Sequence, residues 1–179
     1  DDPLALFVGR LVPHKGIGIL IRSLTYTQRG KLLIVGDGPY KNWLVNLVKK
    51  LDLNDRVIFV GPVDDYWLPS YYSATDVVIL PSTSRLEAFG IVGLEGMATA
   101  KPLILSDIPG VRDVISEKEG YIVEPLDPSA IAEALEKIWN APEMAREMGL
   151  RGRERVEKLF SWEKVSKDVE SVFKNILSK

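Results

Sequence analysis

Short apolar runs that alternate with segments of helical periodicity constrain the fold of this chain more than any other feature. The helix-like segments follow these runs in turn, over 18–24, 40–50, 64–74, 90–98 and 110–115, with Pro69 a kink or boundary in the third. Three consecutive helices over 128–139, 143–158 and 163–177 end the chain. Runs that are apolar throughout are typical of strands buried on both faces of a parallel sheet. The predicted strands cover 4–8, 31–35, 56–60, 77–80, 103–105 and 121–123.

The connections between these strands predict the topology. Right-handed crossovers through the intervening helices give a doubly wound, six-stranded parallel sheet, which is a Rossmann-like α/β fold. The expected strand order is 3-2-1-4-5-6, with a switch point between the first and fourth strands. The loops over 9–16 and 81–89 should therefore flank one crevice at the carboxyl ends of the strands, where such sheets bind ligands.

Composition limits the classes of function. A chain of 179 residues, 46% of them apolar, fits one domain with a real core. A net charge of −2 gives no general attraction to nucleic acid. The chain lacks cysteine and has a single histidine, so thiol chemistry and a histidine-rich metal site are excluded. Apolar runs are too short for a membrane span, and we expect no signal peptide, because the sequence goes almost directly into the first strand.

The loop after the first strand places two cations between two glycines. Arg10 can bind a phosphate group bidentately, and Lys15 supplies a compact charge next to Gly16. The simpler alternative is two solvated surface cations, but the predicted switch point favours anion binding. Gly38, after the second strand, lets the backbone approach a ligand, although a tight turn alone would also account for it.

Two carboxylates, Glu87 and Glu95, bracket seven residues after the fourth strand. The amides and dipole of the following helix suit an anionic group, and the two acids can accept hydrogen bonds from hydroxyls. On a continuous helix their spacing is roughly 80° of rotation, so both could line one crevice. The alternative is one acid at a helix N-terminus and one solvated acid. Phe89 and Gly90 between them favour a ligand, and an anion with a polyol indicates a nucleotide-sugar.

These segments together resemble the C-terminal, donor-binding domain of retaining GT-B glycosyltransferases, specifically glycosyltransferase family 4. Each piece is short, but the set occurs in the right order over nearly the whole chain. The matching pieces are Gly9-Arg10-Leu11, Pro13, Lys15-Gly16, Val35-Gly36-Asp37-Gly38-Pro39, 57–61, Ala74-Thr75-Asp76, Pro81-Ser82, the Glu87 and Glu95 pair, Gly120 and Pro125.

The resemblance implies roles for individual residues. Arg10 and Lys15 would bind the diphosphate and stabilise the departing nucleotide, so no metal and no other cofactor is expected. Glu87 would hold hydroxyls of the donor sugar, and Glu95 those of the ribose. Asp76 would be structural. The remaining donor-binding positions are Gly9, Gly38 at the nucleotide edge, Val60 beside the base, and the amides of Phe89, Gly90 and Ile91 on the diphosphate and sugar.

The resemblance also implies what the chain does. Residues 1–179 would be one donor-binding domain, half of a GT-B enzyme whose N-terminal acceptor domain is absent from this chain. The whole enzyme would move a hexose with retention from a GDP-mannose or UDP-glucose type donor. It would act in the cytoplasm on an acceptor sugar or lipid bound by the missing half, which would also carry any membrane association. The isolated domain should be nearly inactive. A stand-alone nucleotide-binding or partner-binding module without catalysis is the alternative.

Overall fold

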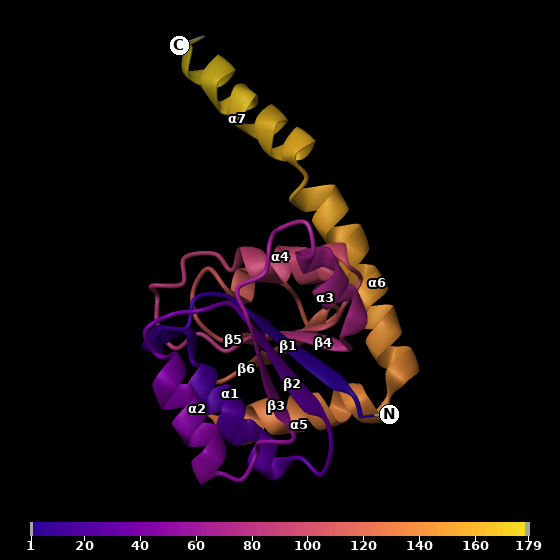
Figure 1. Cartoon of the computed structure of the whole chain (residues 1–179). Coiled ribbons are helices and arrows are strands. Elements are labelled where there is room, and N and C mark those ends of the chain that lie inside the picture. Colours follow the sequence, from indigo (N-terminus) through magenta and orange to yellow (C-terminus); the bar gives the residue numbers. More distant parts are fainter. Residues whose placement is uncertain (1, 178–179) are drawn as a thin grey trace.

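A computed structural model describes residues 2–177 and confirms the predicted sheet (Figure 1). Within that range the sheet has six strands in the order β3-β2-β1-β4-β5-β6. Every neighbouring pair is parallel, with one register shift between Ile34 and Val35 against β3. The strands are β1 (Leu4–Val8), β2 (Lys31–Val35), β3 (Val57–Gly61), β4 (Val77–Leu80), β5 (Leu103–Ser106) and β6 (Gly120–Val123).

The helices follow the predicted segments, with small shifts at their ends. The largest shift is at α3, which begins at Leu68 instead of residue 64, because Pro69 occupies its first turn. The helices are α1 (Ile17–Ser23), α2 (Lys41–Lys50), α3 (Leu68–Ala74), α4 (Ile91–Ala98), α5 (Pro128–Asn140), α6 (Pro142–Leu159) and α7 (Trp162–Leu177), with 3₁₀ turns η1 (Pro13–Lys15), η2 (Leu24–Tyr26) and η3 (Arg112–Val114).

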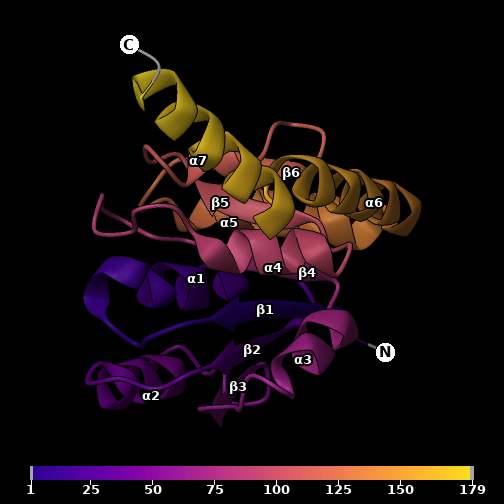
Figure 2. The same cartoon turned by 90° about the horizontal axis from the view of Figure 1, so that it is seen from above.

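The helices cover both faces of the sheet, as the apolar strands require (Figures 1 and 2). The first hydrophobic core joins the sheet to α1, α2 and α5, and the second joins it to α3, α4 and η3. Side chains of β1 alternate between the two: Ala5 and Phe7 belong to the first core, Leu6 and Val8 to the second. Because both faces are buried, neither allows a polar residue, which explains the unbroken apolar run in β1.

The last helix, α7, projects away from the body of the domain (Figure 1). Its side chains are exposed, although Val165, Val169, Val172 and Ile176 recur at helical spacing and form an apolar stripe. No helix in the part of the chain that the structure describes has the length and apolarity of a bilayer-spanning segment.

Candidate functional site

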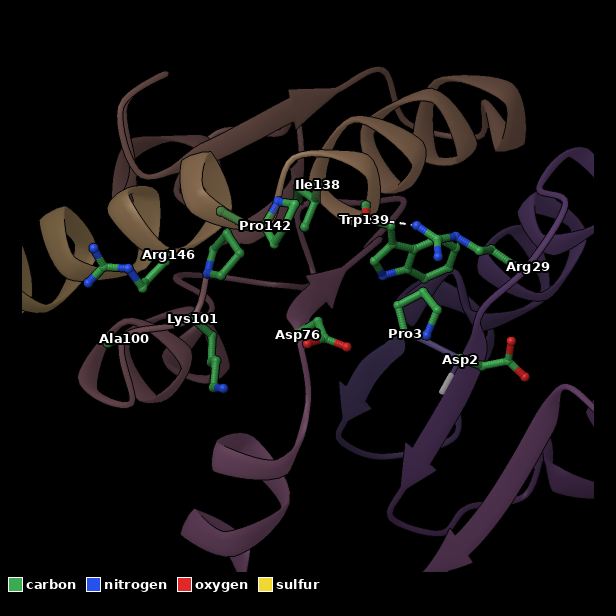
Figure 3. Close-up of a pocket in the computed structure, with 12 residues that line it drawn as sticks. Asp2, Pro3, Arg29, Asp76, Ala100, Lys101, Ile138, Trp139, Pro142 and Arg146 are labelled. Carbon is green, nitrogen blue, oxygen red and sulfur yellow. Dashed lines mark hydrogen bonds between the residues drawn. The ribbon is translucent and has the colours of Figure 1, made fainter.

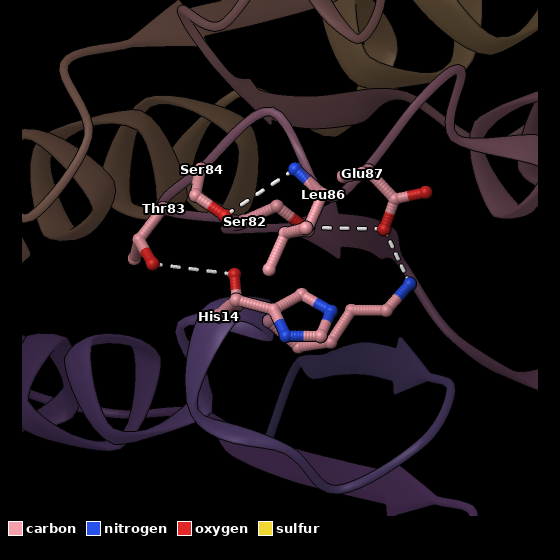
Figure 4. A network of polar contacts seen from close by, with 7 residues as sticks. His14, Ser82, Thr83, Ser84, Leu86 and Glu87 are labelled. Carbon is pink, nitrogen blue, oxygen red and sulfur yellow. Dashed lines mark hydrogen bonds and ion pairs between the residues drawn. The ribbon is translucent and has the colours of Figure 1, made fainter.

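The loops after β1 and β4 meet at the switch point of the sheet, as predicted. Gly16 adopts a left-handed conformation, with φ of 70°, and a Cβ atom there would lie 1.8 Å from the carbonyl oxygen of Pro81. The Thr83 N–H donates to the His14 carbonyl oxygen at 2.8 Å, and the Thr83 hydroxyl donates to the same oxygen at 3.2 Å (Figure 4). The two loops are therefore held together by their backbones.

An ion pair between Lys15 and Glu87 crosses from one loop to the other (Figure 4). The Lys15 ammonium donates to Glu87 Oε2, and the Ser82 hydroxyl donates to the same oxygen at 3.3 Å. The two charged side chains are only 18% and 11% exposed, so solvent screens this pair far less than a typical surface pair. The structure thus brings together the predicted phosphate-binding lysine and the predicted sugar-binding glutamate.

Glu87 does not share a helix with Glu95. Helix α4 begins at Ile91, and Gly90 before it has φ of 78°, a left-handed conformation that an α-helix cannot contain. The rotation of roughly 80° expected on a continuous helix therefore does not describe these two acids. Glu87 instead lies in the turn before the helix and reaches Lys15 from there.

Glu95 lies on α4 and has a different partner. Its Oε2 accepts a hydrogen bond from the Tyr72 hydroxyl on α3. Both side chains line a mostly apolar cavity of about 310 Å³, together with Leu68, Pro69 and Ala98. Burial, the hydrogen bond to Glu95 and the charge of Glu95 all raise the pKa of Tyr72, with burial contributing most. Its hydroxyl therefore stays protonated and remains the donor.

Sequence reasoning did not single out Tyr72. An aromatic residue on a short helix is usually part of the core, and Tyr72 is indeed only 2% exposed. A buried tyrosine hydroxyl nevertheless needs a hydrogen-bond partner, which was the available signal. That signal does not identify the partner, because Tyr72 and Glu95 are 23 residues apart in the sequence.

The other predicted cation, Arg10, is exposed. Within residues 2–177 its guanidinium has no hydrogen bond or ion pair to another side chain or to the backbone. Gly9 precedes it with φ of 148°, in the region that favours glycine. Arg10 thus keeps all its donors available in the same loop that carries Lys15.

The amides at the start of α4 are also available. Among the described residues, the backbone N–H groups of Phe89 and Gly90 have no hydrogen-bond partner, and Ile91 is the first residue of the helix. The first N–H groups of a helix have no acceptor within the helix, so they suit an anion. The Phe89 ring itself packs edge-on against Phe160, with 5.8 Å between ring centroids.

Gly38 has a structural explanation of its own. A Cβ atom there would lie 2.4 Å from the Leu11 carbonyl oxygen, so the loops after β1 and β2 can cross only with glycine at this position. The Leu11 N–H also donates to the Asp37 carbonyl oxygen at 2.9 Å. Val60, on β3, is half-buried and packs against the second core. Among residues 2–177, the close approach to Leu11 accounts for glycine at position 38, and packing accounts for Val60.

A sequence model of the family described as Glycosyl transferases group 1 matches residues 1–155. The chain belongs to this family. An uncharacterised glycosyltransferase from Methanocaldococcus jannaschii is 33% identical over 97% of this chain and 45% of that protein. A GDP-mannose-dependent α-(1-6)-phosphatidylinositol monomannoside mannosyltransferase from Mycolicibacterium smegmatis is 31% identical over 90% of this chain and 45% of that protein.

The fold of the chain also matches that of a solved enzyme structure. Sucrose-phosphate synthase from Thermosynechococcus elongatus superposes with a TM-score of 0.91 and 36% identity, over 99% of this chain and 46% of that one. The predicted half of a GT-B fold is thus confirmed as a Rossmann-like domain of the glycosyltransferase type. The chain spans less than half the length of the curated relatives that it matches.

A second cavity, about 450 Å³, lies at the amino ends of the strands (Figure 3). It is lined by Pro3, Asp76, Trp139 and Arg146 among others, and by none of the predicted site residues. Asp76 Oδ2 accepts a hydrogen bond from the Leu4 N–H at 2.7 Å, which confirms the structural role expected for this residue. The cavity lies at the opposite edge of the sheet from the Lys15–Glu87 pair.

Proposed function

We propose that this chain is the donor-binding half of a retaining glycosyltransferase that transfers a hexose from a nucleoside diphosphate sugar. The observation that supports this proposal most strongly is the Lys15–Glu87 ion pair, which joins the two switch-point loops and is largely shielded from solvent. A cation there suits a diphosphate, and a carboxylate beside it suits sugar hydroxyls. The donor is of the GDP-mannose or UDP-glucose type. The relative from Mycolicibacterium smegmatis, a GDP-mannose-dependent mannosyltransferase, supports the first of these.

The proposed chemistry places positive charge where negative charge develops. As the bond from the anomeric carbon to the diphosphate breaks, charge accumulates on the departing phosphate oxygens. Lys15 and Arg10 would neutralise this charge, and the amides of Phe89, Gly90 and Ile91 would donate hydrogen bonds to it. Because these groups supply the positive potential themselves, we propose that the reaction needs no metal ion or other cofactor.

Binding of the donor would exchange partners within the ion pair. In the free protein Glu87 Oε2 holds the Lys15 ammonium. An incoming diphosphate would take over Lys15, and the released Glu87 carboxylate would accept hydrogen bonds from hydroxyls of the sugar. Ser82, which also donates to Glu87, would hold the carboxylate in place during this exchange. The pair thus keeps both groups ready without leaving an unpaired, poorly solvated charge in the free protein.

The rest of the donor would extend from this pair. Glu95 would hold the ribose hydroxyls, Val60 would line the base, and the backbone at Gly9 and Gly38 would approach the nucleotide. We assign the acceptor, a sugar or a lipid, to a further domain corresponding to the part of the relatives that this chain does not match. On this proposal the isolated chain binds donor nucleotides but turns over very little.

Isothermal titration of the chain with UDP, GDP and ADP, with divalent metals chelated, tests the proposal. At least one of the three should bind saturably, and its affinity should not change when Mg²⁺ is restored. Absence of saturable binding by all three would overturn the donor-site assignment. A strict dependence on Mg²⁺ would overturn the metal-free chemistry alone.

Two substitutions test the cations. Arg10→Ala and Lys15→Ala should each weaken a nucleoside diphosphate by about tenfold, near the strength of a hydrogen bond between charged groups, and weaken the monophosphate less. Arg146→Ala and Lys167→Ala are matched controls, because these cations lie on the exposed surfaces of α6 and α7, outside the loops after β1, β2 and β4. An equal effect on diphosphate and monophosphate would remove the proposed role.

A further inference from the structure

We propose that Tyr72 is a positioning residue that orients the Glu95 carboxylate toward the ribose diol of the donor nucleotide. The inference rests on the proposed function, because it requires Glu95 to bind the ribose. It assigns a task to Tyr72, a residue outside the expected donor-binding set. It follows from a contact between α3 and α4, which are separate segments of the chain joined by the Tyr72–Glu95 hydrogen bond.

The contact holds Glu95 in one orientation. Tyr72 is 2% exposed and belongs to the second hydrophobic core, where it shares the cluster with Leu6, Val8 and Met97. A tyrosine packed on all sides has little rotational freedom, so the position of its hydroxyl is fixed by the core. Glu95 has only partial burial and a long, flexible side chain, and it takes its orientation from that hydroxyl.

The direction of the hydrogen bond is also fixed. Glu95 has no proton to give as a carboxylate, so the Tyr72 hydroxyl donates and Glu95 Oε2 accepts. Burial is the largest cause of the raised pKa of Tyr72, and it keeps this donor protonated. The carboxylate is thus held from one side by a hydroxyl donor whose ionisation is disfavoured by burial.

One oxygen of Glu95 remains available. Within residues 2–177, no hydrogen bond or ion pair engages Glu95 Oε1. The cavity of about 310 Å³ that Glu95 and Tyr72 line is otherwise mostly apolar, with Leu68, Pro69 and Ala98 in its wall. A carboxylate with one oxygen tethered can accept from two neighbouring hydroxyls with the other, which matches the vicinal 2′ and 3′ hydroxyls of a ribose.

A positioning role differs from a purely structural one in what it predicts. If Tyr72 only fills the core, Tyr72→Phe should leave nucleotide binding unchanged, because the ring and its packing are retained. If loss of the Tyr72 hydroxyl loosens the domain generally, the affinities for ribonucleotides and for dideoxyribonucleotides should fall alike. If it orients Glu95, the loss should appear only for ligands that carry ribose hydroxyls.

The experiment compares UDP and GDP with their 2′,3′-dideoxy counterparts by titration of the chain. The unsubstituted chain should prefer the ribonucleotide by about tenfold, the usual strength of a hydroxyl bound to a carboxylate. Tyr72→Phe should reduce that preference to about twofold and leave dideoxynucleotide affinity within about twofold of its starting value. Tyr71→Phe is the matched control, a neighbouring tyrosine of α3 packed against the same core, and it should change neither affinity.

The outcomes separate the two proposals. Equal weakening of both ligand types by Tyr72→Phe, or an unchanged preference, would overturn the positioning role while the proposed function stands. An unsubstituted chain that binds both ligand types equally would overturn it as well, because Glu95 would then not contact the ribose. Only a chain that binds none of these nucleotides would overturn the proposed function itself.

Discussion

Replacement of Glu87 by glutamine should strengthen the binding of a nucleoside diphosphate while weakening the selection for the attached sugar. Glu87→Gln keeps the side-chain size but removes the charge that holds Lys15 in the free protein. The diphosphate then no longer competes with a carboxylate for Lys15, and it no longer approaches a like charge. The two effects act in the same direction for a ligand without a sugar.

The magnitude follows from the burial of the pair. Two charges about 4 Å apart interact by about 4 kcal/mol at an effective dielectric constant of about 20, which suits groups near a protein surface. Side chains that are 18% and 11% exposed also lose part of their hydration, and this cost offsets most of the attraction. A net pairing free energy of about 1–2 kcal/mol remains, so the diphosphate should bind about tenfold tighter to Glu87→Gln.

The nucleotide-sugar should respond differently. Its sugar hydroxyls lose a charged acceptor that contributes about 1.5–3 kcal/mol, which cancels the gain at Lys15. The ratio of nucleotide-sugar affinity to diphosphate affinity should therefore fall by about tenfold or more. Titration of both ligands against both proteins measures this ratio. Glu143→Gln is the matched control, because Glu143 is 86% exposed on α6, where it pairs with Arg146.

Diphosphate affinity that falls, or stays the same, in Glu87→Gln would refute the partner-exchange argument. It would mean that Lys15 does not have to leave Glu87 when the diphosphate binds. An unchanged ratio of the two affinities would instead remove Glu87 from the sugar site.

Two further predictions concern stability. Gly16→Ala should lower the free energy of unfolding by more than about 3 kcal/mol, because it adds a clash with the Pro81 carbonyl to an unfavourable backbone angle. Gly61→Ala has the unfavourable angle but open space around the new Cβ atom, so it should cost about 1 kcal/mol. Equal losses for the two variants in urea titration would contradict this reasoning. The side-chain hydrogen bond from Ser129 is the main cause that lowers the pKa of Asp127, the N-cap of α5. The contribution of the ionised Asp127 to stability should therefore be complete above its unfolded-state pKa of about 3.9 and be lost as the pH falls through the lower pKa of the folded state. The Tm difference between the unsubstituted chain and Asp127→Asn should accordingly shrink in acid.

The fold could be predicted from the sequence because burial on both faces leaves a strong signal. Residues such as Leu6 and Phe7 point to opposite cores, and both must be apolar. Right-handed crossovers then leave few possible strand orders. The start of α3 was less predictable, because Asp64 and Asp65 look like a helix N-terminus while Pro69 sets the actual first turn.

The candidate site was predictable as a place but not as a set of contacts. The switch point brings the loops of Lys15 and Glu87 together whatever their side chains are. Which carboxylate meets the lysine depends on the left-handed turn at Gly90, and a glycine in a sequence does not reveal its backbone angles. The Tyr72–Glu95 contact depends on how α3 packs against α4, and neither residue carries a local pattern for it.

The backbone joining of the two switch-point loops limits how such a domain can diversify. Loops around a ligand site usually tolerate insertions and deletions. Here an inserted residue near Thr83 would break its hydrogen bonds to His14, and it would also separate Glu87 from Lys15. The connection over 62–67 is mostly exposed and takes no part in that joining, so changes in length are cheapest there. On the proposed function, the neighbouring end of β3 contacts the donor base. Changes in the connection over 62–67 could therefore alter the choice of base while the contacts among Lys15, Glu87 and Thr83 stay intact.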